Sequence, residues 1–163
     1  MDAGLNTFQL SHALSHCPIT KDFFQGVYPS DYLDMIEQPP KMIVVNTDPS
    51  YKSGQHWLLF FKDGETYEMF DSLGRDITSY NNDIINFANR FATTLKYIDT
   101  RLQPEDSSLC GQYCLYFSYH RCNGESMDTI VNNMHSADWI KSCIDIMFDV
   151  PNLISDCQIC EKL

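Results

Sequence analysis

The sequence predicts an α+β fold in which a central mixed β-sheet is flanked by helices. Strand-like apolar runs are concentrated between residues 41 and 70, and amphipathic helical patterns occupy much of the remaining chain. The length of 163 residues favours a single domain over residues 1–163. With 44% hydrophobic and 20% charged residues, the composition is typical of a globular protein and not of a disordered one.

A short helix is predicted over residues 7–16, with Asn6 or Thr7 as its N-cap. The apolar residues of this segment are spaced so that they can share one face. These residues are Phe8, Leu10, Ala13 and Leu14. Residues 23–31 contain glycine and proline and are interpreted as a loop that leads into a turn.

A buried strand and a β-hairpin follow. The continuous apolar run of residues 41–47 predicts a buried strand. Residues 57–61 and 66–70 predict two more strands, joined by a turn at residues 62–65. The middle of the chain therefore supplies the strands of the predicted sheet.

Helices dominate the second half. An amphipathic helix is predicted over residues 82–95, with Ile84, Ala88, Phe91 and Leu95 on one face, and residues 96–99 are a short strand candidate.

A helix over residues 109–120 should turn Tyr113, Tyr116 and Phe117 inward. Two short helices are expected at about residues 127–134 and 138–148. Pro151 should end the last helix, and residues 152–163 are expected to form a loosely held tail.

The charge balance argues against a nucleic-acid partner. The formal net charge is −11, and no run of lysine or arginine exceeds one residue, whereas phosphate binding needs clustered positive charge. No apolar stretch approaches the ~20 residues of a membrane span. Seven cysteines without an export signal predict free thiols in an intracellular, reducing compartment.

No metal site is predicted. Cys157 and Cys160 have the spacing of half a zinc site or of a redox pair, but no second pair of suitable spacing lies nearby, so we expect free thiols. Cys114, Cys122 and Cys143 are expected to be packing residues.

One group of residues has the chemistry of acyl transfer by a cysteine nucleophile. Cys110 begins the predicted 109–120 helix, where Ser107 or Ser108 can act as cap and the helix dipole favours a thiolate. His56 precedes one strand of the hairpin and Asp71 follows the next. Because the start of one antiparallel strand lies beside the end of its partner, the hairpin places His56 next to Asp71.

These positions suggest specific roles. His56 would act as the base and Asp71 would orient its ring. The side chain of Gln103 and the backbone N–H of Cys110 could form an oxyanion hole. Gly111 would leave room for a substrate backbone to approach, which makes it a candidate substrate contact.

The order His, Asp, Gln, Cys resembles that of the adenovirus maturation protease (adenain) and of the wider group that includes SUMO-processing proteases. The resemblance includes a tryptophan directly after the histidine and the Gln-x6-Cys-Gly spacing. It runs from about residue 20 to 125 and looks closer to adenain than to the SUMO group. The matching segments are residues 24–28, 45–47, 54–57, 69–74 and 103–114.

Carried over, the resemblance makes Cys110 the nucleophile, His56 the general base and Gln103 the oxyanion-hole amide. Asp71 takes the third place, where many adenain sequences carry Glu, and Trp57 would wall the cleft beside His56. The implied fold is that of the adenain-like cysteine proteases, with the nucleophile at a helix N-terminus.

The implied activity is that of a cysteine endopeptidase. Its substrates would be Gly-rich sites of the Gly-X-Gly or Gly-Gly type in virion precursor proteins of a DNA virus or a virus-like mobile element. The implied setting is the virion or the nucleus or cytoplasm of an infected host cell. We expect a monomer that requires no cofactor.

An activating peptide is a further implied partner, since adenain is activated by a peptide through a disulfide. Here no cysteine lies between Cys17 and Cys110, so the cysteine that would form this disulfide is missing. A peptide could still add to the sheet as an edge strand.

Two other functions remain open. One is an isopeptidase that removes a ubiquitin-like modifier, which would need a broad surface for a folded partner. The other is an inactive binding module with the same fold, against which the presence of all four chemical residues argues.

Overall fold

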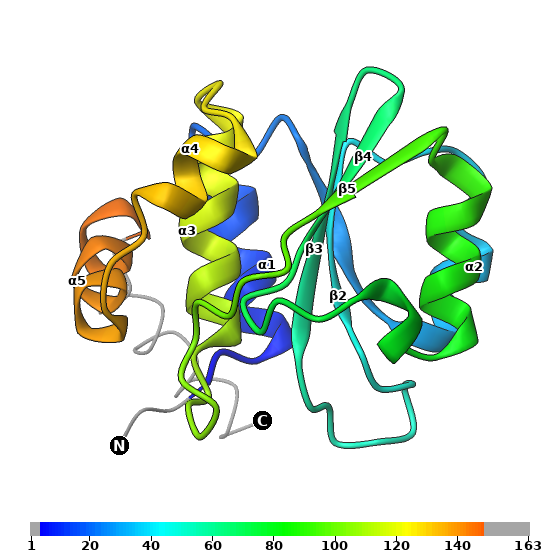
Figure 1. Ribbon diagram of the computed structural model, residues 1–163, viewed down its shortest axis with the longest axis horizontal. Helices are drawn as coiled ribbons and strands as arrows, with labels where there is room; N and C mark the ends of the chain where they lie inside the picture. The colour runs from blue at the N-terminus through cyan, green and yellow to red at the C-terminus, as the bar shows by residue number, and fades with distance from the viewer. Residues whose placement is uncertain (1–3, 149–163) are drawn as a thin grey trace.

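The computed structural model describes residues 4–148. A five-stranded sheet runs through the middle of the molecule, with helices on both sides (Figure 1). Its outer pairs, β1–β2 and β4–β5, are parallel, whereas β2, β3 and β4 pair antiparallel. The predicted α+β fold with a central mixed sheet is confirmed. The strands, in spatial order, are β1 (Phe24–Pro29), β2 (Met42–Asn46), β3 (Trp57–Asp63), β4 (Thr66–Phe70) and β5 (Thr94–Tyr97).

The helices form two layers. One layer holds α1 (Thr7–His16) and α3 (Cys110–Cys122), with α4 (Met127–Asn132) and α5 (Ala137–Phe148) packed outside α3 (Figure 1). The other layer holds α2 (Asn82–Phe91) and the 3-10 helix η1 (Ser30–Met35). A second 3-10 turn, η2 (Ile77–Ser79), precedes α2.

Alternate residues of the central strands feed two separate cores. In β3, Leu59 and Phe61 face α1 and α3, whereas Leu58 and Phe60 face α2. Successive side chains of a strand point to opposite faces, so a strand covered on both sides needs an unbroken apolar run. This explains the continuous hydrophobic segments of β2 and β3.

The hairpin that carries the candidate site is tighter than its sequence predicts. Both predicted strands are confirmed, but β3 continues to Asp63, which pairs with Thr66. Only Gly64 and Glu65 form the turn, and Gly64 has a φ of 59°. A two-residue turn with positive φ matches the twist of the flanking strands and therefore holds their register.

Helix α1 forms where predicted. Asn6 is its N-cap: the Asn6 side chain accepts from the Gln9 backbone, and the Gln9 side chain accepts from the Asn6 backbone. Leu10, Ala13 and Leu14 are buried, whereas Phe8 remains 46% exposed, so the four residues do not form one buried face.

The prediction of a loop over residues 23–31 is also wrong. Residues 24–29 form β1, which pairs in parallel with β2. Gly26 has a φ of 130°, and the register shifts between Phe24 and Val27. A bulge at glycine breaks the alternation by which a strand is recognised in a sequence.

The helix predicted over residues 82–95 ends at Phe91. Ala92 is extended, and Leu95 lies in β5, opposite Tyr67 of β4. The strand predicted at residues 96–99 therefore begins two residues earlier. Pairing with β4 overrides the helical spacing of the apolar residues.

Helix α3 packs on the sheet through the shared apolar core, and an aromatic stack and a buried ion pair add to this contact. The Phe117 ring stacks on Phe70 at a centroid distance of 4.4 Å. Arg121 Nε donates to Glu68 at 2.7 Å, a second guanidinium nitrogen lies 2.7 Å from Asp63, and the guanidinium lies 4.5 Å from the centre of the Phe61 ring. The predicted inward face of Tyr113, Tyr116 and Phe117 is confirmed.

The last two helices form close to the predicted positions. Cys114 is fully buried, as predicted, whereas Cys122 and Cys143 are half-buried. Pro151, the predicted tail of residues 152–163, and the Cys157–Cys160 pair lie outside the described residues.

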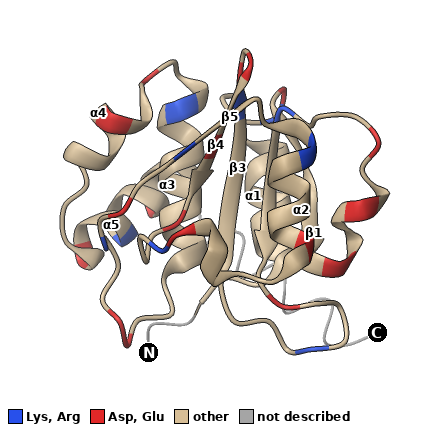
Figure 2. Cartoon of the chain, turned by 45° about the vertical axis from the view of Figure 1, so that its right-hand side comes forward, with Lys and Arg blue, Asp and Glu red and all other residues tan. Residues whose placement is uncertain are grey.

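Basic residues stand apart from one another on the surface. Figure 2 shows lysine and arginine on separate elements, among more numerous acidic residues. Among the described helices, none combines the length and the apolar character that a membrane crossing requires.

Substitution of Arg121 by alanine should destabilise the fold. It would leave the buried Glu68 carboxylate without its partner, and breaking a buried ion pair in this way costs about 3–5 kcal/mol. Urea unfolding would measure the loss. The control is Arg101→Ala, which removes an exposed pair with Glu105 and should change stability little. Equal effects of the two substitutions would contradict the docking role of Arg121.

Candidate active site

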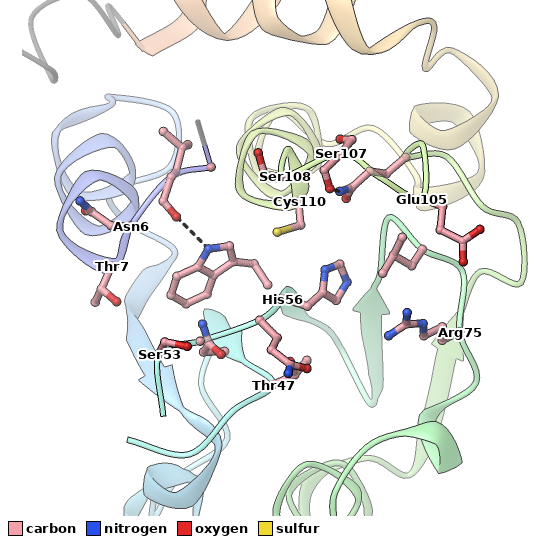
Figure 3. A pocket seen from close by; sticks show the side chains of 18 residues that line it. Asn6, Thr7, Thr47, Ser53, His56, Arg75, Glu105, Ser107, Ser108 and Cys110 are labelled. Atoms are coloured by element: carbon pink, nitrogen blue, oxygen red, sulfur yellow. Dashed lines mark hydrogen bonds between the residues drawn. The ribbon is translucent and has the colours of Figure 1, made fainter. Parts of the chain in front are cut away.

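A cleft of about 520 Å³ contains three of the four predicted chemical residues, namely His56, Gln103 and Cys110. In Figure 3 the side chains of Cys110 and His56 both point into it. Segments distant in the sequence form its walls. They are residues 4–7, 46–47, 53–57, 73–75 and 103–110.

His56 and Asp71 are neighbours, as the hairpin geometry predicts. His56 directly precedes β3 and Asp71 directly follows β4. The Nε2 of His56 lies 2.7 Å from Oδ1 of Asp71, and both side chains are buried. A carboxylate only accepts hydrogen bonds, so Nε2 carries a proton and the other nitrogen, Nδ1, is left for the nucleophile.

The surroundings of His56 favour its protonated form. Burial of the ring opposes protonation, but hydrogen bonds to Asp71 and to Cys110, together with the negative charge of these groups, outweigh it and raise the pKa of His56 to about 9. The imidazole thus interacts with the carboxylate and with the thiol of Cys110. This arrangement favours the imidazolium form of His56 beside that thiol at neutral pH.

Asp71 is held by four hydrogen-bond donors. Besides His56, it accepts from the backbone N–H groups of Leu73 at 2.8 Å and Arg75 at 3.0 Å, and from the hydroxyl of Tyr80. Burial alone would raise the pKa of Asp71, but these donors and the charge of His56 lower it below its ordinary value. Near neutral pH the Asp71 carboxylate is therefore charged, and it faces the protonated ring of His56.

Cys110 is the first residue of α3, as predicted. The predicted serine cap is wrong: Leu109 occupies the N-cap position without a side-chain hydrogen bond, and Ser107 Oγ instead accepts from the backbone N–H of Leu109. The first turn of a helix has N–H groups without partners inside the helix. Such groups favour negative charge at Cys110 and on a bound substrate.

Gln103 is buried at the cleft, with its amide held on both ends. Ser72 Oγ donates to Oε1 at 2.7 Å, and Nε2 donates to the backbone carbonyl of Ser107 at 2.6 Å. An amide nitrogen carries two protons, so Nε2 keeps one for a ligand in the cleft. This is the chemistry that the predicted oxyanion role requires.

Trp57 lines the cleft next to His56, as the resemblance implies. Its ring nitrogen donates to the backbone carbonyl of Leu5 at 2.9 Å, an interaction drawn as a dashed line in Figure 3. Residues 4–7 thereby become a wall of the site. Sequence reasoning missed this segment, because no local pattern shows that it packs against a tryptophan fifty-two positions away.

Gly111 does not open toward the cleft. A Cβ at this position would lie 3.0 Å from Leu5 Cβ and 3.4 Å from Trp57 Cδ1. The missing side chain therefore lets the N-terminal segment and Trp57 pack closely against α3. The expected space for a substrate backbone is absent at this position, and the geometry gives Gly111 a packing role.

Cys114, one turn after Cys110, differs from it in environment. Burial raises the pKa of Cys114 well above its ordinary value, and the charges of Cys110 and Asp71 add to the effect. Its thiol lies 3.6 Å from the backbone carbonyl of Trp57. Burial likewise raises the pKa of Cys122 to about 12 and raises that of Cys143. These three cysteines are therefore poor nucleophiles.

Two further residues of the site were not predicted. Tyr80 supports the Asp71 carboxylate, and Ser72 supports the Gln103 amide. Ser72 directly follows the predicted acid, within the segment 69–74 that carries the resemblance, and this adjacency was the available signal. Tyr80 lies in an irregular segment that gives no signal.

A smaller pocket of about 220 Å³ continues the cleft beyond Trp57. The two share five lining residues, namely Thr7, Asn46, Ser53, Gly54 and Trp57. Val27, Tyr28 and Pro29 of β1 contribute to the smaller pocket. The cleft thus has room for several residues of an extended chain.

Substitution of Asp71 by asparagine should lower the pKa of His56. The variant loses the negative charge and the carboxylate acceptor, so burial would then favour the neutral ring. NMR titration should show a midpoint of about 9 in the parent protein, with the imidazolium present below it, and a shift toward or below 6.5 in the variant. Asp76→Asn, at an exposed cap of η2, should leave the midpoint near 9. A parent midpoint near 6.5 would contradict the arrangement described for His56.

No protein-family model matches the chain. Over 128 residues, the sequence is 30% identical to the R355 protein of Acanthamoeba polyphaga mimivirus, which is named as a thiol protease. The match covers 72% of this chain and 42% of R355, so the chain spans less than half the length of this relative.

Two solved structures share the fold. The ASFV pS273R protease superposes with a TM-score of 0.66 at 16% identity, over 91% of this chain and 68% of that protein. ChlaDub1 from Chlamydia trachomatis superposes with a TM-score of 0.54 at 12% identity, over 99% of this chain and 93% of that protein. The chain is thus similar in sequence to a viral thiol protease, and it shares its fold with the ASFV pS273R protease and with ChlaDub1.

Proposed function

We propose that the chain is a cysteine endopeptidase. The observation that carries the proposal is the position of His56, whose ring joins the buried Asp71 carboxylate to the Cys110 thiol at a cleft. A thiol, a base oriented by a carboxylate, and an amide donor are the groups that acyl transfer requires. The named relatives support the same reaction class.

In the first half of the reaction, the Cys110 thiolate attacks the carbonyl carbon of the scissile peptide bond. The C–S bond forms as the carbonyl electrons move to oxygen. The N–H of Cys110 and the free N–H of Gln103 stabilise this oxyanion. Protonated His56 then donates the proton on Nδ1 to the leaving nitrogen, the C–N bond breaks, and a thioester remains.

In the second half, neutral His56 removes a proton from a water molecule that attacks the thioester. The tetrahedral intermediate collapses, the C–S bond breaks, and the thiolate is regenerated beside a protonated His56. Asp71 remains charged and keeps the ring oriented throughout. The thiol, imidazole and amide supply every step, so the proposal needs no metal or organic cofactor.

The walls beside Cys110 favour glycine at the cleavage site. Trp57 is held by its hydrogen bond to Leu5, and its ring lies so close to α3 that a Cβ at Gly111 would be 3.4 Å from Cδ1, so it cannot move aside easily for a substrate Cβ. A rigid aromatic wall admits a glycine backbone and excludes branched side chains. We therefore propose cleavage at Gly-Gly or Gly-X-Gly sites.

The relatives suggest the biological setting. R355 belongs to a virus, and pS273R is a protease of ASFV. We propose virion precursor proteins of a DNA virus or a virus-like mobile element as substrates, and the virion or infected cell as the location. A monomer is proposed as the active form, with an activating peptide as an optional partner.

Cys110→Ala should abolish cleavage, because the covalent intermediate cannot form. Cys114→Ala removes a neighbouring thiol whose pKa is raised by burial, and should keep activity. A peptide vinyl probe should label the parent protein and Cys114→Ala but not Cys110→Ala. Activity that survives in Cys110→Ala would refute the proposal, and absence of labelling at Cys110 would favour an inactive binding module.

Gln103→Ala should lower kcat by about 10²–10³-fold through loss of one oxyanion donor. KM should change little, because the donor acts mainly on the charge that develops in the transition state. Steady-state kinetics on a Gly-X-Gly peptide would measure both constants. An unchanged kcat would remove Gln103 from the mechanism.

The substrate class can be tested in the same assay. Short peptides with Gly-X-Gly or Gly-Gly sites should be cleaved, and their Ala-substituted counterparts should not. A ubiquitin-like modifier joined through Gly-Gly serves as the competing substrate. Cleavage of the modifier conjugate but not of the peptides would indicate an isopeptidase.

A further inference from the structure

The amide of Gln103 is fixed in one orientation by two partners of different kinds. Its nitrogen lies 2.6 Å from the backbone carbonyl of Ser107, and its oxygen lies 2.7 Å from Ser72 Oγ. A backbone carbonyl only accepts, so the nitrogen must face Ser107. The oxygen then faces Ser72, whose hydroxyl must donate.

Ser72 is well placed to hold this orientation. Its side chain is fully buried, and its backbone carbonyl accepts from the backbone N–H groups of both Leu102 and Gln103 at 2.9 Å. One residue thus anchors the backbone of the Gln103 segment and the end of its side chain. Ser72 is not among the residues that line the cleft, so it acts on Gln103 and not on a substrate.

Ser72 directly follows Asp71, and each of these two residues orients one group of the site. Asp71 orients the His56 ring, and Ser72, the next residue, orients the Gln103 amide. Two adjacent residues at the end of β4 therefore position the general base and the oxyanion donor together. The relative placement of these two groups depends on a single peptide segment.

We propose that Ser72 is a positioning residue for the proposed proteolysis and that its hydroxyl keeps the N–H of Gln103 directed at the oxyanion. Without this donor, Oε1 would be buried without a partner and the amide could rotate more freely. An amide that turned its oxygen toward the oxyanion would repel it. The inference rests on the proposed function and adds a residue that no motif assigns to the reaction.

A double-mutant cycle tests the proposal. Ser72→Ala should lower kcat about tenfold with KM nearly unchanged, as expected for loss of one neutral hydrogen bond. If Ser72 acts through Gln103, the double variant Ser72→Ala/Gln103→Ala should be no slower than Gln103→Ala alone. The same tenfold loss in both backgrounds would overturn the proposal, as would an unchanged kcat in Ser72→Ala.

The control is Ser118→Ala. Ser118 is also fully buried, and among residues 4–148 its hydroxyl donates to the carbonyl of Leu115 within α3, so the variant should keep the parent kcat. Thermal unfolding of each variant checks that the fold is retained. If Ser72→Ala does not fold, Ser72→Cys replaces it in the cycle, because a thiol has similar size and is a weaker donor.

The cycle also separates this proposal from the proposed function. Loss of activity in Gln103→Ala with additive effects of Ser72→Ala would refute only the positioning role. Full activity in Cys110→Ala would refute the proteolytic mechanism itself.

Discussion

The candidate site depends on how α3 packs against β3 and β4. Cys110 lies on the helix, whereas His56 and Asp71 lie on the hairpin, so the thiol meets the imidazole only when the two elements dock. Phe117 stacked on Phe70, and Arg121 paired with Glu68, hold that contact. The aromatic stack helps to set the distance between α3 and the sheet, and the buried ion pair helps to fix the position of α3 along the strands.

Asp71 makes the largest set of polar contacts among the candidate catalytic residues. A buried carboxylate is costly unless its oxygens are satisfied, and here they accept four hydrogen bonds. Two of these come from backbone N–H groups just after β4. Asp71 therefore holds both the turn that contains Ser72 and the ring of His56. The start of α3 complements this carboxylate, because the first turn of a helix favours negative charge near Cys110.

The local sequence predicted the parts of the site that depend on local geometry. A two-residue turn at Gly64 makes β3 and β4 a hairpin, and pairing then brings His56 to Asp71 without knowledge of the remaining chain. The same reasoning failed where distant contacts decide. The irregular register around Gly26 interrupts the alternating pattern by which β1 could have been predicted. Pairing with β4 places Leu95 in a strand, although its spacing indicated a helix. The role of Leu5 at Trp57, and the packing of Gly111, depend on segments that meet only in the folded chain.

The division of the site between hairpin and helix has a consequence for the newly made chain. His56 is synthesised 54 residues before Cys110, and the hairpin can form early because its contacts are local. At that stage the imidazole lacks the thiol and the thiol lacks a helix, so neither has the environment described for the folded protein. Docking of α3 therefore brings the thiol and the imidazole together, and a chain in which α3 has not yet docked lacks the pair on which the proposed reaction depends.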